Sequence, residues 1–186
     1  MGAVVFDLES NGLINDATRI HCVALHWLED SISEAFNDEP YGDGTFCIKE
    51  EAPMGGNYSI QTALSWLECA DVIIGHNVIG FDLPLAKRLY PWFNPSGIIV
   101  DTLLLSRLYH PNLLDIDRRA EKIPSKLYGR HSLEAWGYRL GIHKGDFSQD
   151  TDWQKWSQEM QDYCIQDVAV TTKLCKHFQP FLIGSN

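Results

Sequence analysis

Two short apolar runs constrain the fold of this chain most strongly. Residues 71–75 read Asp-Val-Ile-Ile-Gly and residues 97–100 read Gly-Ile-Ile-Val, with no polar alternation inside either run. Such runs predict strands that are buried on both faces, as in a sheet covered by helices on each side. A helix predicted over 59–70, with Ser59 as its N-cap, precedes the first run, and a helical segment follows each run. The alternation of strands and helices predicts an α/β fold.

The N-terminal segments add antiparallel strands to this sheet. Strands predicted over 3–8 and 20–28 are joined by a short polar connection, which favours antiparallel pairing. A third strand is expected over 44–49. The remainder of 29–58 is acidic and rich in glycine and proline, so we expect solvent-facing loops without chemistry there. The prediction is a single α/β domain over 1–186, with a mixed sheet flanked by helices.

Composition narrows the class of function. Apolar residues make up 45% of the 186 residues, enough for a hydrophobic core, and 15 basic against 25 acidic side chains give a net charge of −10. This balance argues against a protein that holds duplex nucleic acid on a broad basic face, but it does not argue against an enzyme that clusters acids to hold metal and contacts only a short strand end. No signal peptide or membrane span is visible, so we expect a cytoplasmic protein. The cysteines, expected to be reduced and mostly buried, are Cys22, Cys47, Cys69, Cys164 and Cys175.

The first predicted strand carries two acids near its end. Asp7 and Glu9 lie two residues apart, so their side chains share one face of an extended strand. Two unpaired carboxylates buried side by side are costly, and a divalent cation would remove that cost. Taken alone, the pattern is better explained by a strand end that frays into solvent at Ser10–Gly12.

A third acid follows the first apolar run. Asp82 stands where the N-cap of a helix is expected, with Pro84 tolerated in the first turn and Pro91 ending the helix. Capping alone would explain Asp82. The carboxyl ends of strands in an α/β sheet are, however, also where ligand-binding crevices form.

A fourth acid lies on the buried side of the last helix, which is expected to run from about Asp152 to Phe178. The apolar residues of this segment step by three and four, and Asp167 falls on their stripe, four residues after Tyr163. An acid on a core-facing stripe either pairs with a nearby Arg or Lys or belongs to a functional site.

Together these segments resemble the three exonuclease motifs of the Tyr-containing branch of the DEDD superfamily (DEDDy). The matching residues are Asp7 and Glu9 in the first motif, Asn77, Phe81 and Asp82 in the second, and Tyr163 and Asp167 in the third. Residues 100–108 and 129–141 are similar to the proofreading domain of short-tailed bacteriophage family A DNA polymerases. The likeness runs from about residue 3 to 178 and implies a ribonuclease H-like fold.

The resemblance implies a 3′–5′ exonuclease that releases nucleoside 5′-monophosphates from DNA ends with two Mg²⁺ or Mn²⁺ ions. The implied metal ligands are Asp7, Glu9, Asp82 and Asp167. Asp7 would bridge both ions, and Glu9 and Asp167 would complete the site of the ion that holds the attacking water. Asp82 would act on the second ion, and Tyr163 would position the nucleophile. Because no polymerase segment follows, we expect a free-standing exonuclease or a separately encoded proofreading subunit in phage replication.

Substrate contacts are expected outside the acids. Asn77 would hydrogen-bond the terminal nucleotide, and Leu8 would pack against its base. Phe81 is also expected to be a substrate-binding residue. Single-stranded or frayed ends suit such apolar platforms. The strongest basic cluster spans 118–131 and fits either a solvated loop or a segment that contacts phosphates. Its expected substrate-binding residues are Arg118, Arg119, Lys122 and Arg130.

Two other functions remain open. An exoribonuclease would use the same acids, because the choice between DNA and RNA depends on contacts to the 2′-OH. A non-catalytic module that binds nucleic acid or a polymerase is disfavoured, because such a module has no need to keep all five motif residues. The histidines show no metal-ligand spacing, so a zinc site is not expected. We expect a monomer, with a polymerase as a possible partner that holds the DNA.

Overall fold

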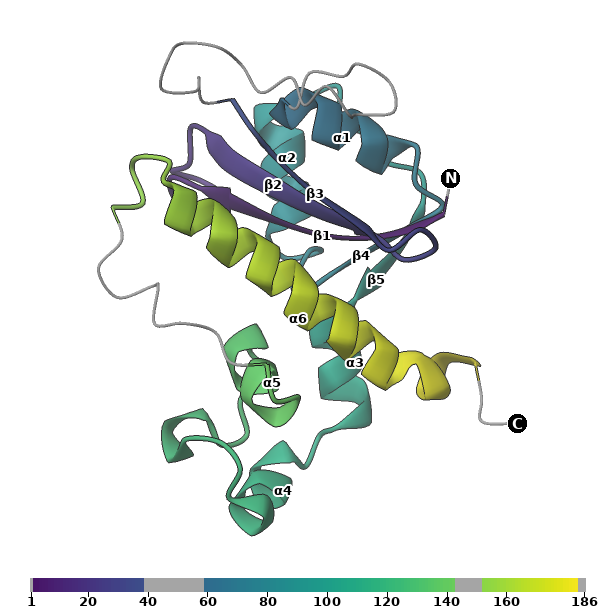
Figure 1. Cartoon of the computed structure of the whole chain (residues 1–186), viewed down its shortest axis with the longest axis vertical. Helices are drawn as coiled ribbons and strands as arrows, with labels where there is room; N and C mark the ends of the chain where they lie inside the picture. The colour runs from purple at the N-terminus through teal and green to yellow at the C-terminus, as the bar shows by residue number, and fades with distance from the viewer. Residues whose placement is uncertain (1, 39–58, 143–151, 184–186) are drawn as a thin grey trace.

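The structure, a computed structural model, describes residues 2–38, 59–142 and 152–183 (Figure 1). One mixed sheet and its flanking helices confirm the expected fold class. The strands are β1 (Ala3–Ser10), β2 (Ile20–Trp27), β3 (Ile32–Asn37), β4 (Val72–Gly75) and β5 (Ile98–Asp101). The helices are α1 (Ile60–Glu68), α2 (Asp82–Leu89), α3 (Thr102–Tyr109), α4 (Leu113–Ala120), the 3₁₀ turn η1 (Ser125–Leu127), α5 (Leu133–Arg139) and α6 (Gln158–Ile183). None of the helices in these ranges is both long and apolar enough to cross a bilayer.

The sheet has the order β3-β2-β1-β4-β5. The β1–β2 and β2–β3 pairs are antiparallel, and the β1–β4 and β4–β5 pairs are parallel. In Figure 1, α6 crosses one face of this sheet, while α1 and α2 lie on the other. The expected antiparallel pairing of the first two strands and the strands at both apolar runs are therefore confirmed.

Alternation along β1 divides the core into two layers. Phe6 and Leu8 are buried in the cluster that includes residues of α1 and α2. Val5 is buried on the opposite face, in the cluster that contains Cys164 and Val168 of α6. Each fully buried side chain of this kind contributes about 2 kcal/mol to stability. The face of β1 that carries Asp7 and Glu9 is thus the face that α6 covers.

A third group of helices packs against the other side of α6. Leu113 of α4 and Trp136 of α5 are buried together with Val170 and Leu174 of α6. We refer to residues 113–140 as the α4–α5 lobe. Trp136 is the large aromatic side chain at the centre of this contact.

Two strand predictions are corrected by the structure. β3 lies in the acidic segment that was expected to form loops. Phe36 is the one fully buried residue of this edge strand, so the sequence shows no alternation of apolar residues that would predict a strand. The run at 97–100 was expected to be buried on both faces, but β5 is the other edge of the sheet and Ile98 is 69% exposed. The strand expected over 44–49 and Cys47 lie outside the described residues.

The start of the last helix is also corrected. α6 begins at Gln158 rather than near Asp152, because the Ser157 hydroxyl accepts a hydrogen bond from the Met160 N–H at 3.2 Å and so caps the helix there. Among the described cysteines, all free thiols, Cys69 is exposed rather than buried.

Candidate active site

The site forms where β1 extends past its neighbour in the sheet. β4 pairs with β1 only from Ala3 to Val5, so Asp7 and Glu9 lie beyond the end of β4. At these residues the edge of β1 on the β4 side is therefore no longer paired with β4. Both acids are half-buried beneath α6, where the Cys164 thiol contacts the Asp7 carbonyl oxygen at 3.4 Å.

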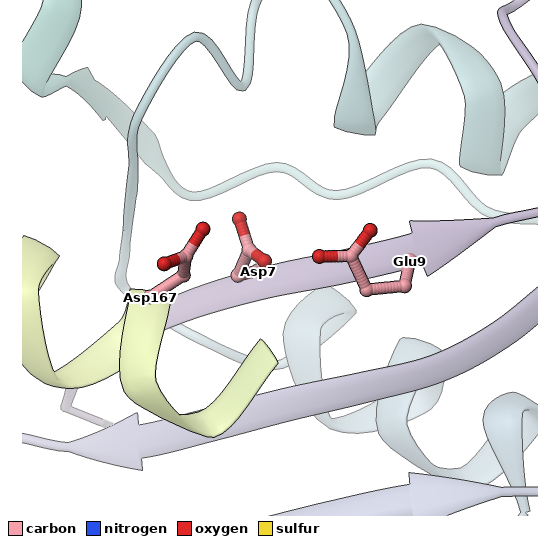
Figure 2. Close-up of side chains that lie close together, drawn as sticks. All are labelled: Asp7, Glu9 and Asp167. Atoms are coloured by element: carbon pink, nitrogen blue, oxygen red, sulfur yellow. The ribbon is translucent and has the colours of Figure 1, made fainter. Parts of the chain in front are cut away.

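α6 brings the fourth predicted acid to the same place. Cys164 and Val168 face the sheet, and Asp167 lies beside them with only 7% of its surface exposed. One carboxylate oxygen from each of Asp7, Glu9 and Asp167 lies within 4.8 Å of the others. Figure 2 shows the three carboxylates converging from β1 and α6 on one small volume. The predictions that Asp7 and Glu9 share one face of β1 and that Asp167 lies on the buried side of its helix are confirmed.

Asp82 lies next to this group but outside it. It is the first residue of α2, while Phe81 occupies the N-cap position, so the prediction that Asp82 caps the helix is wrong by one residue. The carboxylate instead accepts a hydrogen bond from the Leu8 N–H, on the open edge of β1. Burial, reinforced by the charges of Asp101 and Asp167, raises the pKa of Asp82 to about 7.

The loop between β4 and α2 is held by another buried acid. The Asp101 carboxylate accepts hydrogen bonds from the N–H groups of Asn77 (2.9 Å), Ile79 (3.2 Å) and Leu103 (2.9 Å). The bond from Leu103 makes Asp101 the N-cap of α3, and the other two bonds fix the position of the loop that leads to Asp82. Sequence reasoning missed this second role, because it depends on β4 and β5 being neighbours.

The turn at residues 77–80 of the second motif depends on backbone conformation and close packing. Asn77 adopts a positive φ of 66°, a backbone conformation that asparagine tolerates better than most residues. A Cβ atom on Gly80 would lie 2.6 Å from the Asn77 Oδ1 atom, so a side chain there would force Asn77 to move. Asn77 and Gly80 therefore shape the turn that directs the chain into α2.

Tyr163 lies one turn before Asp167 on α6. Burial and the nearby carboxylates of Asp167, Glu9 and Asp7 raise the pKa of its hydroxyl, which donates a hydrogen bond to Asp167. The phenol is therefore protonated at neutral pH and can act as a donor but not as a base.

One buried contact beside the site was not predicted from the sequence. The Thr102 hydroxyl donates to the Gly75 carbonyl at 3.0 Å, so it accepts from His76 Nδ1, 2.9 Å away. This arrangement requires the Nδ1–H tautomer of His76. The position of His76 directly after β4, on the sheet edge where the acids gather, was the available signal.

The predicted substrate-binding residues differ in their exposure to solvent. Leu8 is 3% exposed and belongs to the α1–α2 side of the core, so the expectation that it packs against a base is wrong. The alternation that exposes Asp7 and Glu9 to the site turns Leu8 away from it. Phe81 packs against the same core, and Asn77 is exposed. The four basic residues predicted to bind substrate, Arg118, Arg119, Lys122 and Arg130, are exposed on the α4–α5 lobe, as is Lys126.

The chain is similar in sequence to two phage DNA polymerases. No protein-family model matches the chain. The DNA-directed DNA polymerase of Enterobacteria phage T3 is 31% identical and that of Escherichia phage T7 is 30% identical, each over 95% of this chain. The chain spans 27% of the length of each polymerase.

Solved structures share the fold at low sequence identity. The Brucella melitensis protein NrnC is 21% identical, with a TM-score of 0.61 over 97% of this chain and 73% of its own. Exonuclease I of E. coli, in complex with a 5cy-dT13 oligonucleotide, is 18% identical, with a TM-score of 0.54 over 97% of this chain and 41% of its own. The chain is thus similar in sequence to the two phage DNA polymerases over the matched region, and it shares its fold with NrnC and exonuclease I.

Proposed function

We propose that this chain is a metal-dependent 3′–5′ exodeoxyribonuclease of the DEDDy type. The observation that carries the proposal is the convergence of Asp7, Glu9 and Asp167, from β1 and α6, within 4.8 Å of one another. Tyr163 and the buried Asp82 complete the set. Three mutually repelling carboxylates in a half-buried place are unfavourable without a cation, so the arrangement supports a role in metal binding.

The donor set fits hard divalent cations. Carboxylate oxygens are the ligands that Mg²⁺ and Mn²⁺ prefer, and the structural relative NrnC was also solved with bound Mg²⁺. The residues proposed to hold two such ions are Asp7, Glu9, Asp82 and Asp167. When bound, the ions would activate water, stabilise the leaving 3′ oxygen and neutralise the phosphate charge.

The protein's own groups would orient the reaction. Tyr163 keeps its proton and donates to Asp167, so it is placed to orient a water molecule rather than to deprotonate one. Asp101 would act indirectly, because its three backbone hydrogen bonds hold the loop that leads to Asp82. Asn77, exposed on that loop, remains the proposed contact to the terminal nucleotide.

DNA is the substrate that we propose, because both sequence relatives are DNA polymerases. With a net charge of −10, the chain has little basic surface for duplex DNA, so single-stranded or frayed 3′ ends are favoured. A monomer that acts in proofreading or DNA degradation in phage replication, with a polymerase as a possible partner, fits these features. The fold shared with NrnC, one structure of which is bound to pGG, supports short oligonucleotides, including RNA, as the second candidate substrate.

A nuclease assay on 5′-labelled single strands of DNA and RNA of one sequence tests the proposal. We expect stepwise shortening of the DNA from its 3′ end with Mg²⁺ or Mn²⁺ and none in EDTA. Asp7→Asn should lower kcat by about a hundred- to a thousandfold, because it removes a proposed ligand of both ions. Asp162→Asn, which changes an exposed acid on the same helix α6, serves as the matched control and should retain activity. Full metal-dependent activity in Asp7→Asn would refute the site assignment.

A further inference from the structure

The exposed basic residues of the α4–α5 lobe belong to one segment. It runs from the last turn of α4 to just before α5, over residues 118–130, and we call it the basic strap. Its exposed cations are Arg118, Arg119, Lys122, Lys126 and Arg130. Isolated surface cations of this kind are usually mobile and bind phosphate weakly, unless the backbone beneath them is fixed.

A single buried carboxylate fixes that backbone. Asp117, 3% exposed, immediately precedes the strap and accepts a hydrogen bond from the Gly129 N–H near the other end at 2.8 Å. Arg139 of α5 donates to both Asp117 oxygens, from Nε at 3.0 Å and from Nη2 at 2.7 Å. Burial alone would raise the pKa of Asp117, but these hydrogen bonds outweigh it and hold the pKa below its ordinary value. The segment is therefore closed at its base by a charged clamp in which both Asp117 carboxylate oxygens accept hydrogen bonds.

The neighbouring residues make the clamp rigid. Gly129 adopts a positive φ of 71°, and a Cβ atom there would lie 3.1 Å from the Leu114 Cβ atom, so glycine is required for the turn that presents its N–H to Asp117. The Arg139 guanidinium stacks over the Trp136 ring at 5.0 Å. Just beyond the strap, His131 Nδ1 lies 2.7 Å from the Ser106 hydroxyl of α3.

The packing of α6 places this lobe beside the acids. On α6, Cys164 and Val168 face the sheet, while Val170 and Leu174 pack against the lobe. Asp167 follows Cys164 by three residues and precedes Val170 by three, so it lies on the side of the helix between the two contacts. A strand whose 3′ end meets the acids therefore has the α4–α5 lobe as the neighbouring surface.

We propose that Asp117 is a positioning residue that fixes the basic strap for binding the phosphates of single strands long enough to extend from the acids to the lobe. This inference rests on the proposed exonuclease function and adds a length preference to it. Short substrates such as dinucleotides meet the acids without reaching the strap, so their hydrolysis should not depend on Asp117.

Charge alone predicts the opposite result. Asp117→Asn removes a negative charge beside five cations, which by Coulomb attraction would tighten the binding of a phosphate chain. If the clamp positions the strap, the same substitution should weaken the binding of long strands. The sign of the change in KM therefore separates positioning from a general electrostatic effect.

The test compares hydrolysis of a dinucleotide and of a DNA strand of about 20 nucleotides. For Asp117→Asn we expect KM on the long strand to rise about tenfold, with kcat on both substrates and KM on the dinucleotide within about twofold of the wild type. Glu134→Gln, which removes an equal charge from an exposed acid 4.0 Å from Lys126, is the matched control and should not raise KM. Arg139→Lys keeps the charge but loses the bidentate contact to Asp117. Its KM on the long strand should lie between those of Asp117→Asn and the wild type.

Two further measurements keep the outcome decisive. Because Asp117→Asn leaves Arg139 buried without its anion, the double variant Asp117→Asn/Arg139→Gln provides a neutral clamp if the single variant does not fold. Binding of the long strand in EDTA is also measured against salt, and the slope of log affinity on log salt should flatten in the clamp variants. An unchanged or lowered KM on the long strand, or parallel losses on both substrates, would overturn the proposal. Absence of hydrolysis by the wild type would refute the exonuclease function, while the binding series would still decide the role of the strap.

Discussion

Replacing Asp82 with asparagine is expected to stabilise the metal-free protein at neutral and higher pH, although Asp82 is a proposed metal ligand. The side chain is 4% exposed, and burial together with Asp101 and Asp167 raises its pKa to about 7. The fold therefore accommodates this carboxyl more readily as a neutral acid than as an anion. Asparagine has a similar shape and no charge, so it should relieve the unfavourable burial.

The direction of the pH dependence follows from the two protonation equilibria. In the unfolded chain the carboxyl of Asp82 loses its proton near pH 3.8, whereas in the folded protein it does so near pH 7. Between these values the folded state holds the extra proton, so the free energy of unfolding decreases as pH rises through this window and stays low above it. The difference between the two pKa values of Asp82 corresponds to a change of about 4 kcal/mol in the free energy of unfolding. For a chain of this length, this sets an upper limit of roughly 10 °C on the change in Tm.

Thermal unfolding in EDTA measures the effect. Asp82→Asn should raise the Tm at about pH 8 and leave it nearly unchanged at about pH 4, where the folded protein already holds the proton. Asp101→Asn is a control of opposite sign, because the Asp101 carboxylate holds three backbone N–H groups, and it should lower the Tm at about pH 8. A lower Tm for Asp82→Asn at about pH 8, or the same change at both pH values, would contradict the reasoning.

Two further substitutions separate roles within the site. Tyr163→Phe should lower kcat by about ten- to a hundredfold with little change in KM, because the orienting hydroxyl is lost while the acids remain. Steady-state kinetics on single-stranded DNA with Mg²⁺ measures both constants. An unaltered kcat would exclude Tyr163 from the mechanism. Leu8→Ala should destabilise the protein by about 2–5 kcal/mol in urea unfolding, because the side chain is buried in the core. If Leu8→Ala instead leaves stability intact and raises KM, Leu8 contacts the terminal base after all.

Local periodicity was sufficient to place most of the acids. The two-residue spacing of Asp7 and Glu9 and the apolar stripe around Asp167 each predicted a shared or buried face, and the structure confirms both. What periodicity could not supply is the distance between β1 and α6, which depends on the topology of the whole sheet. The resemblance to the exonuclease motifs supplied that link, because it implies that the acids of the first and third motifs share metal ions.

The features missed from the sequence depend on contacts between distant segments. Asp117 meets Arg139 only because the chain turns at Gly129, and the sequence around each residue reads as an ordinary exposed helix. β3 was missed because at this sheet edge Phe36 is the buried residue, which leaves no strong apolar pattern. In each case the decisive information is the partner, which local sequence does not contain.

The buried carboxylates of this protein fall into two groups that only their partners distinguish. Asp101 accepts three backbone N–H bonds, and Asp117 accepts one backbone N–H and two guanidinium bonds, so both are compensated anions that fix the backbone. Asp82 instead lies where burial and neighbouring acids oppose its charge and raise its pKa. A buried aspartate that is compensated as an anion serves structure, whereas one whose pKa is raised by burial and by neighbouring acids is a candidate for a functional site. This contrast supports the proposal that Asp82 acts with the acids of β1 and α6, and the proposal that Asp117 holds the strap.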